Sequence, residues 1–245
     1  VSCLLFNIAI EPLAAALRKS ALRGISLPGA PERLVAKLFA DDTTAFLGPG
    51  DDYTEIVRVT DTWCRGSGAK FNLGKTEFIP IGTKEFRDRV IATRALGPGT
   101  APFPHGTKVA KDGEAIRILG AWLGNKVNSE VSWHPLLALM RKNLARWARS
   151  NPTLRGKKLI VGMEIGGRTQ FRAKAQGMPP AVETCIKNMI RHFIWGEAKR
   201  PAVAYDILLA SEETGGLALL DIAARNDAID LMWLKSYLDF SVTRP

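Results

Sequence analysis

The spacing of hydrophobic residues predicts a helix, a pair of strands and a second helix in the first third of the chain. Residues 3–23 carry leucine and isoleucine at the spacing of an amphipathic helix, and Gly24 follows as a stop signal. Two short runs with strand character, 34–39 and 43–47, come next. A second amphipathic pattern covers residues 52–66.

The middle of the chain has a weaker pattern with many turn residues. Residues 71–81 read as mixed strand and turn, and residues 97–106 read as a loop rich in proline and glycine. The stretch 108–123 is predicted to be a β-hairpin, because Asp112-Gly113 is a strong two-residue turn signal between two candidate strands.

After Gly124 the pattern becomes helical. One helix face is predicted from Leu136, Met140, Asn143, Leu144 and Trp147. A further helix is expected over 181–195, with Glu183 and Lys187 as an i,i+4 ion pair and five inward residues: Val182, Ile186, Met189, Ile190 and Phe193. The last helix is expected over 227–238. We therefore predict an α+β part, 1–125, followed by an all-helical part, 126–245.

Composition narrows the class of protein. Hydrophobic residues make up 46% of the chain, which is ordinary for a globular protein. No apolar run approaches the roughly 18 residues of a membrane span. The three cysteines lie far apart, without a CxxC pair, and an odd count of this kind suits a reducing compartment. We expect an intracellular protein, nuclear or cytoplasmic, that is neither secreted nor in a membrane.

Positive charge is concentrated in one segment. The net charge is +10, and residues 141–200 alone hold 14 Lys or Arg against three Glu, so the rest of the chain is close to neutral. Such a segment is typical of a protein that binds a polyphosphate, although a solvated helical surface has the same composition.

The sharpest candidate for chemistry is Phe39-Ala40-Asp41-Asp42 between the two predicted strands. Two adjacent carboxylates at a hairpin tip repel each other unless a cation compensates, and Mg²⁺ bound to nucleotide phosphates would do so. The competing interpretation is a solvated acidic turn, like Asp51-Asp52 a few residues later.

Further motifs follow this pair in a fixed order. They are Gly68-x-x-x-Asn72-x-x-Lys75-Thr76, then the run 118–124 (ILGAWLG), and later Phe193-Ile194-Trp195-Gly196 and Gly215-Gly216-Leu217. Together with the apolar helix before Asp41, this series resembles the reverse transcriptases of non-LTR retrotransposons over most of the chain. The resemblance implies a partial polymerase palm, an antiparallel sheet with helices, followed by a helical thumb.

The resemblance also implies roles for single residues. Asp41 would be a direct ligand of Mg²⁺ (or Mn²⁺), and Asp42 a weaker ligand or a support. Lys75 would lie near the departing pyrophosphate, where an ammonium group neutralises charge or donates a proton. The implied hairpin that grips the primer would contain Leu119, Gly120 and Trp122, although Trp122 also fits an ordinary core aromatic.

The basic helices would form the thumb. Their cations would follow the phosphates of a primer–template duplex without reading its sequence, and the candidates are Arg141, Lys142, Arg146, Arg149, Arg155, Lys157 and Lys158. The implied partners are an RNA template, a DNA primer and deoxynucleoside triphosphates.

One element of the family's catalytic set has no counterpart here. The family needs a further aspartate from a motif that precedes the helix at 3–23, so we expect this polypeptide by itself to be inactive as a polymerase. Two alternatives stay open: a non-catalytic basic nucleic-acid-binding protein, and a metal-dependent nuclease or nucleotidyltransferase with other carboxylates. Oligomeric state is not predicted.

Overall fold

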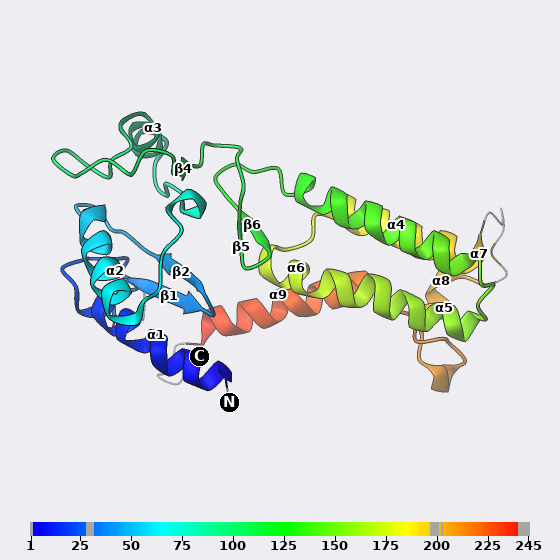
Figure 1. Ribbon diagram of the computed structural model, residues 1–245. Helices are drawn as coiled ribbons and strands as arrows, with labels where there is room; N and C mark the ends of the chain where they lie inside the picture. The colour runs from blue at the N-terminus through cyan, green and yellow to red at the C-terminus, as the bar shows by residue number, and fades with distance from the viewer. Residues whose placement is uncertain (1, 28–31, 197–200, 202, 240–245) are drawn as a thin grey trace. The chain divides into compact units, whose positions relative to one another are not determined.

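The fold is α+β and consists of two compact units (Figure 1). The computed structural model describes residues 2–27, 32–196, 201 and 203–239. The first unit comprises Val1–Leu119 and Gly124–Val127, and the second comprises Gly120–Leu123 and Asn128–Pro245. Residue 125, the predicted boundary, lies inside Gly124–Val127, the last segment of the first unit. In the described ranges, no helix is both long enough and apolar enough to cross a bilayer.

The first unit begins with the predicted order of helix, strand pair and helix. These elements are α1 (Ser2–Lys19), β1 (Ala36–Phe39), β2 (Asp42–Ala45) and α2 (Tyr53–Ser67). The two strands pair antiparallel. The helices and strands close over a small core formed by Leu13, Leu17, Leu22, Val35 and Val59.

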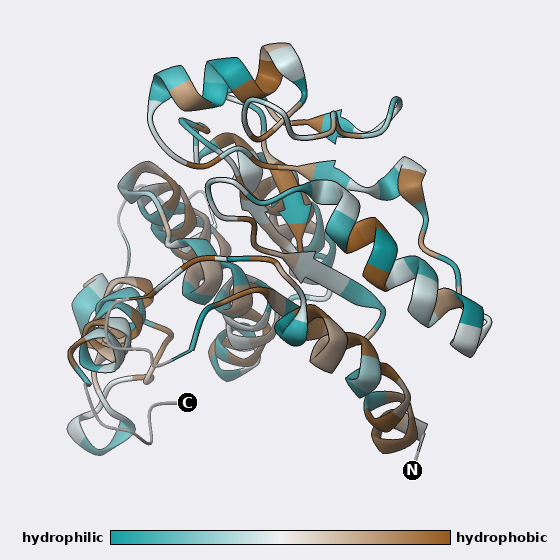
Figure 2. Cartoon of the chain, turned by 90° about the vertical axis from the view of Figure 1, so that its left-hand side faces the viewer, coloured by the Kyte–Doolittle hydropathy of each residue, from teal (hydrophilic) through white to brown (hydrophobic). Residues whose placement is uncertain are grey.

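Helix α1 departs from its prediction in two ways. It ends at Lys19, four residues earlier than expected. Its first half is not core, since the side chains of Leu4 and Ile8 are 69% and 70% exposed. Figure 2 shows this end of α1 as a hydrophobic stretch at the N-terminus. Helical periodicity found the apolar face correctly but could not show that only its second half is covered.

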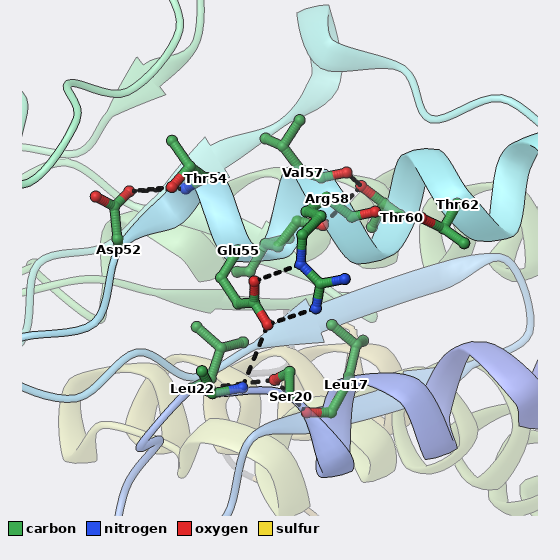
Figure 3. A network of polar contacts seen from close by, with 12 residues as sticks. Leu17, Ser20, Leu22, Asp52, Thr54, Glu55, Val57, Arg58, Thr60 and Thr62 are labelled. Atoms are coloured by element: carbon green, nitrogen blue, oxygen red, sulfur yellow. Dashed lines mark hydrogen bonds and ion pairs between the residues drawn. The ribbon is translucent and has the colours of Figure 1, made fainter.

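Asp51 and Asp52 organise the start of α2 and are not a solvated turn. Asp51 is 3% exposed, and its carboxylate accepts hydrogen bonds from the backbone N–H groups of Arg23, Gly24 and Gly48. Asp52 is the N-cap of α2 and accepts from the backbone N–H of Thr54 at 2.8 Å (Figure 3). The comparison of this pair with a bare acidic turn was therefore wrong.

The other end of α2 is set by Gly68, which has a left-handed φ of 73° and whose N–H binds the Cys64 carbonyl. This is the usual glycine C-cap. The first residue of the Gly68–Thr76 motif therefore has a structural role as the end of α2.

The rest of the first unit consists of short helices and strands. They are η1 (Leu73–Lys75), β3 (Glu77–Phe78), α3 (Lys84–Thr93), β4 (Lys108–Val109) and β5 (Ile116–Ile118). Strands β3 and β4 pair in parallel, next to a cluster in which the rings of Phe78 and Phe103 stack at 3.9 Å.

The predicted hairpin around Asp112-Gly113 is wrong. A turn does form there, with Gly113 at a φ of 88°, but β4 pairs with β3 and not with the strand that follows. The carboxylate of Asp112 instead accepts two hydrogen bonds of 2.8 Å from Arg87. The hairpin lies later, between β5 and β6 (Ala121–Leu123), with Leu119 and Gly120 as its turn.

The second unit is helical apart from β6. Its elements are η2 (Val131–Trp133), α4 (His134–Ala148), α5 (Leu154–Val161), the π-helical η3 (Gly162–Gly167), α6 (Arg168–Gln176), α7 (Pro180–Trp195), α8 (Tyr205–Leu209), η4 (Glu212–Thr214) and α9 (Ile222–Leu238). The five residues predicted to face inward from 181–195 are all buried, and Glu183 pairs with Lys187 at 2.9 Å, so both predictions are confirmed. Helix α9 begins five residues earlier than predicted because Asp221 caps it.

Candidate functional site

Asp41 and Asp42 lie at the tip of the β1–β2 hairpin. The register pairs Phe39 with Asp42, so the turn contains only Ala40 and Asp41. Ala40 takes a left-handed φ of 50°, which a two-residue hairpin turn requires. The predicted strand–turn–strand is confirmed, and Asp42 belongs to the second strand. Both carboxylates are exposed and can accept a ligand.

A hollow of about 720 Å³ opens beside this tip, within the first unit. Strand β2, helix α2, the segment 69–79 and strand β5 form its walls. Three of the predicted site residues line this hollow: Asp42, Lys75 and Leu119. Asp41 sits at the adjacent turn and is not part of the lining.

Lys75 reaches the hollow from a single 3₁₀ turn. Its N–H binds the Asn72 carbonyl at 3.0 Å, and the N–H of Thr76 binds the Leu73 carbonyl at 3.0 Å. The Thr76 hydroxyl also donates to the Asn72 carbonyl. The motif spacing Asn72-x-x-Lys75-Thr76 therefore builds a tight turn that leaves the lysine side chain exposed.

Two further cations, Lys70 and Arg117, line the same hollow. Neither was singled out from the sequence. Arg117 lies between two isoleucines of β5, and this alternation indicates that its side chain points away from the core. The sequence alone could therefore have identified Arg117. Within the described part of the chain, no ion pair engages the side chains of Lys70, Lys75 or Arg117.

Three acidic residues line the hollow, and one of them is already paired with a lysine. Glu77 lies 3.6 Å from Lys108 and is thereby compensated, which leaves Asp42 and Asp61. Three cations without an ion pair among the described residues thus stand against these two carboxylates and Asp41 at the adjacent turn, so the site is close to neutral, and the tip carboxylates favour an anionic ligand that arrives with a divalent cation.

The oxygen atoms of Asp41 and Asp42 are of the type that Mg²⁺ prefers, since this ion binds carboxylate, phosphate and water oxygens. Over residues 2–27, 32–196, 201 and 203–239, no group of three or more His, Cys, Asp or Glu side chains gathers as a ready metal site. Asp41 and Asp42 would thus supply only part of the coordination of such an ion, and oxygens of the bound ligand would supply the rest.

The predicted primer-grip residues divide between the units. Leu119 belongs to the first unit, and Gly120 and Trp122 belong to the second. Trp122 is 37% exposed, so the alternative of a core aromatic was wrong. Gly120 has a φ of 90°, and a Cβ there would come 3.1 Å from a ring carbon of Phe171. The positive φ favours glycine, and any side chain there would also require the exposed Phe171 ring to shift slightly.

The seven predicted thumb cations separate into two groups. Lys142, Arg146 and Arg149 follow one another at i, i+4 and i+7 at exposed positions of α4 and the residue after it, so they form one stripe. In the described ranges no carboxylate pairs with them. We call these three residues the α4 stripe.

The other four cations have neighbours within the second unit. Arg141 donates to the Cys185 sulfur at 2.9 Å, and Lys157 donates to the Ile194 carbonyl at 2.7 Å. Lys158 pairs with Glu212 at 2.5 Å. Hydrogen bonding from Lys158, with a smaller charge effect of Arg155, lowers the pKa of Glu212. Arg155 and Lys158 are therefore poorer candidates for phosphate contacts than the α4 stripe, whereas Arg141 and Lys157 have neutral partners and keep their full charge.

No protein-family model matches this chain.

Proposed function

We propose that this chain is part of an RNA-directed DNA polymerase of the non-LTR retrotransposon kind, with the first unit as a partial palm and the second as the thumb. One observation supports this most directly: Asp42 and Lys75 line the same hollow, and Asp41 stands at the adjoining turn. Carboxylates beside a hollow that also holds a lysine without an ion pair in the described part of the chain are part of the set that nucleotidyl transfer to a primer end uses, and the family's further aspartate would complete that set.

In this proposal each residue acts on a nucleotide in the hollow. Asp41 and Asp42 would hold magnesium, which when bound supplies charge neutralisation at the attacking and leaving oxygens. Lys75 would stabilise or protonate the departing pyrophosphate. Exposed Leu119 and Trp122 would support the primer strand, and the α4 stripe would follow the duplex backbone.

The activity belongs to a polypeptide that also supplies the family's further aspartate. The test is primer extension on an RNA template with magnesium, using the open reading frame extended upstream. Asp41→Ala should lower the rate at least a hundredfold. The matched control is Asp61→Ala, because Asp61 is also a carboxylate of the hollow but lies on α2. Full activity of the Asp41→Ala protein would refute the assignment.

A second candidate is a basic protein that binds nucleic acid without catalysis, which the α4 stripe favours by itself. It predicts tight duplex binding with no extension by the upstream-extended protein in magnesium or manganese. Extension that depends on Asp41 excludes it.

A further inference from the structure

Helices α4 and α7 enclose a second hollow, of about 970 Å³, wholly within the second unit. Its floor is formed by Leu144, Met189 and Phe193, which are core residues. Its walls carry short side chains at exposed positions: Ala145 and Ala148 on α4, and Ala181, Thr184 and Asn188 on α7. We call this hollow the α4–α7 groove.

The dimensions of the α4–α7 groove suit a helix. Its lining residues on α7 recur every three or four positions from Ala181 to Gly196, which corresponds to about 22 Å of helix. Short wall side chains let another helix approach closely, and an apolar floor stabilises the apolar face of an amphipathic helix. A groove of this length would take a partner helix of roughly four turns.

The groove is also cationic. Arg141 and Lys157 line it. Their partners, the Cys185 sulfur and the Ile194 carbonyl, carry no full negative charge. Among the described residues no ion pair joins Arg141 or Lys157 to a carboxylate. Glu130 lines an adjacent hollow with Arg141 but does not pair with it, and the two glutamates described between 141 and 196 are engaged elsewhere. Glu164 is 4% exposed and binds Asn143, Trp147 and Arg168. Glu183 binds Lys187 and Asn226. An occupant would meet two uncompensated positive charges.

We propose that the α4–α7 groove binds an amphipathic helix of a partner protein through its apolar face and two acidic residues, which pair with Arg141 and Lys157. The neighbours of these cations on α7, Cys185 and Phe193, are eight residues apart, or about 12 Å along the helix axis. Acidic residues two turns apart on the partner helix match that spacing. This binding does not depend on the polymerase proposal.

Nucleic acid fits this groove less well than a helix does. The lining holds two aromatic rings, and Phe193 is only 6% exposed, so His192 is the one ring of the lining that a base could stack on. The cations available to phosphates, the α4 stripe, lie on a different side of α4 from Arg141, because 141 and 142 are consecutive positions on a helix.

The probe is a synthetic sixteen-residue helical peptide with leucines on one face and glutamates at i and i+7 beside that face. Its affinity for the full chain would be measured by fluorescence anisotropy, next to a peptide with lysines in place of the glutamates and a scrambled peptide. Arg141→Glu should weaken the glutamate peptide at least tenfold and strengthen the lysine peptide. Ala145→Trp, which fills the groove from an exposed position, should weaken both. Arg146→Glu, on the same helix outside the groove, should change either affinity less than twofold.

Three results would overturn the proposal. The first is equal binding of the glutamate and scrambled peptides. The second is unchanged binding after Ala145→Trp, which would place the peptide elsewhere. The third is displacement of the peptide by a single-stranded oligonucleotide, or by dodecanoate, with equal sensitivity to Arg141→Glu and Arg146→Glu. That result would mark the surface as a general anion site.

Discussion

Asp42 and Lys75 line one hollow although they come from separate elements, the first residue of β2 and the last residue of η1. The hairpin tip fixes the carboxylate, and the 3₁₀ turn presents the ammonium group.

Lys75→Ala in the upstream-extended protein is expected to lower kcat for primer extension about a hundredfold with little change in primer–template affinity, because a positioned proton donor acts on the leaving group. Lys75→Arg should restore charge but not proton donation, and should recover only part of the rate. Lys70→Ala is the control, since Lys70 lines the same hollow outside the motif turn. A purely supporting role for Lys75 would instead raise KM and leave kcat unchanged.

Asp51→Ala is expected to destabilise the protein by about 3 kcal/mol, because three backbone N–H groups lose their shared acceptor in a buried place. Urea denaturation measures the loss. Asp41→Ala removes a carboxylate of the same kind at an exposed turn, and its effect should stay within about 0.5 kcal/mol. Similar losses for the two variants would contradict the different roles given to the two aspartate pairs.

The ion pair of Arg87 and Asp112 should make stability depend on pH. Hydrogen bonding from Arg87 lowers the pKa of Asp112 from 3.8 to about 2. Because the folded pKa lies below the unfolded one, the pair contributes stability above pH 4, and this contribution is lost as the pH falls towards 2.

The check is the free energy of unfolding against pH, compared between the protein and its Asp112→Asn variant. The variant should be less stable at pH 6, and its curve should be flatter below pH 4 by up to about one proton taken up on unfolding. Parallel curves would show that Asp112 is unpaired in solution.

The α4 stripe should dominate the salt dependence of duplex binding. Arg146→Gln and Arg149→Gln are each expected to reduce the slope of log affinity against log salt by about 0.9, because each would release one fewer counterion. Lys158→Gln is the control, since that lysine is already paired with Glu212. Equal effects of all three variants would mean that only net charge matters.

Local chemistry made much of this protein predictable. The hairpin tip at Asp41 is fixed by two short strands with two residues between them, and the inward face of α7 follows directly from its periodicity. Both depend on contacts between near neighbours in the sequence, where backbone geometry leaves few choices.

Tertiary structure decided the rest, because it selects among features that look equal in the sequence. In the sequence, Asp51-Asp52 looks like Asp41-Asp42. In the structure, Asp51 accepts hydrogen bonds from distant backbone N–H groups and Asp52 caps a helix, whereas Asp41 and Asp42 are exposed. The hairpin predicted at Asp112-Gly113 does not form, because β4 pairs with β3 and Asp112 binds Arg87, which lies 25 positions away in the sequence. Periodicity says which side chains share a face, and only packing says which face is covered, as the exposed first half of α1 and the open α4–α7 groove show.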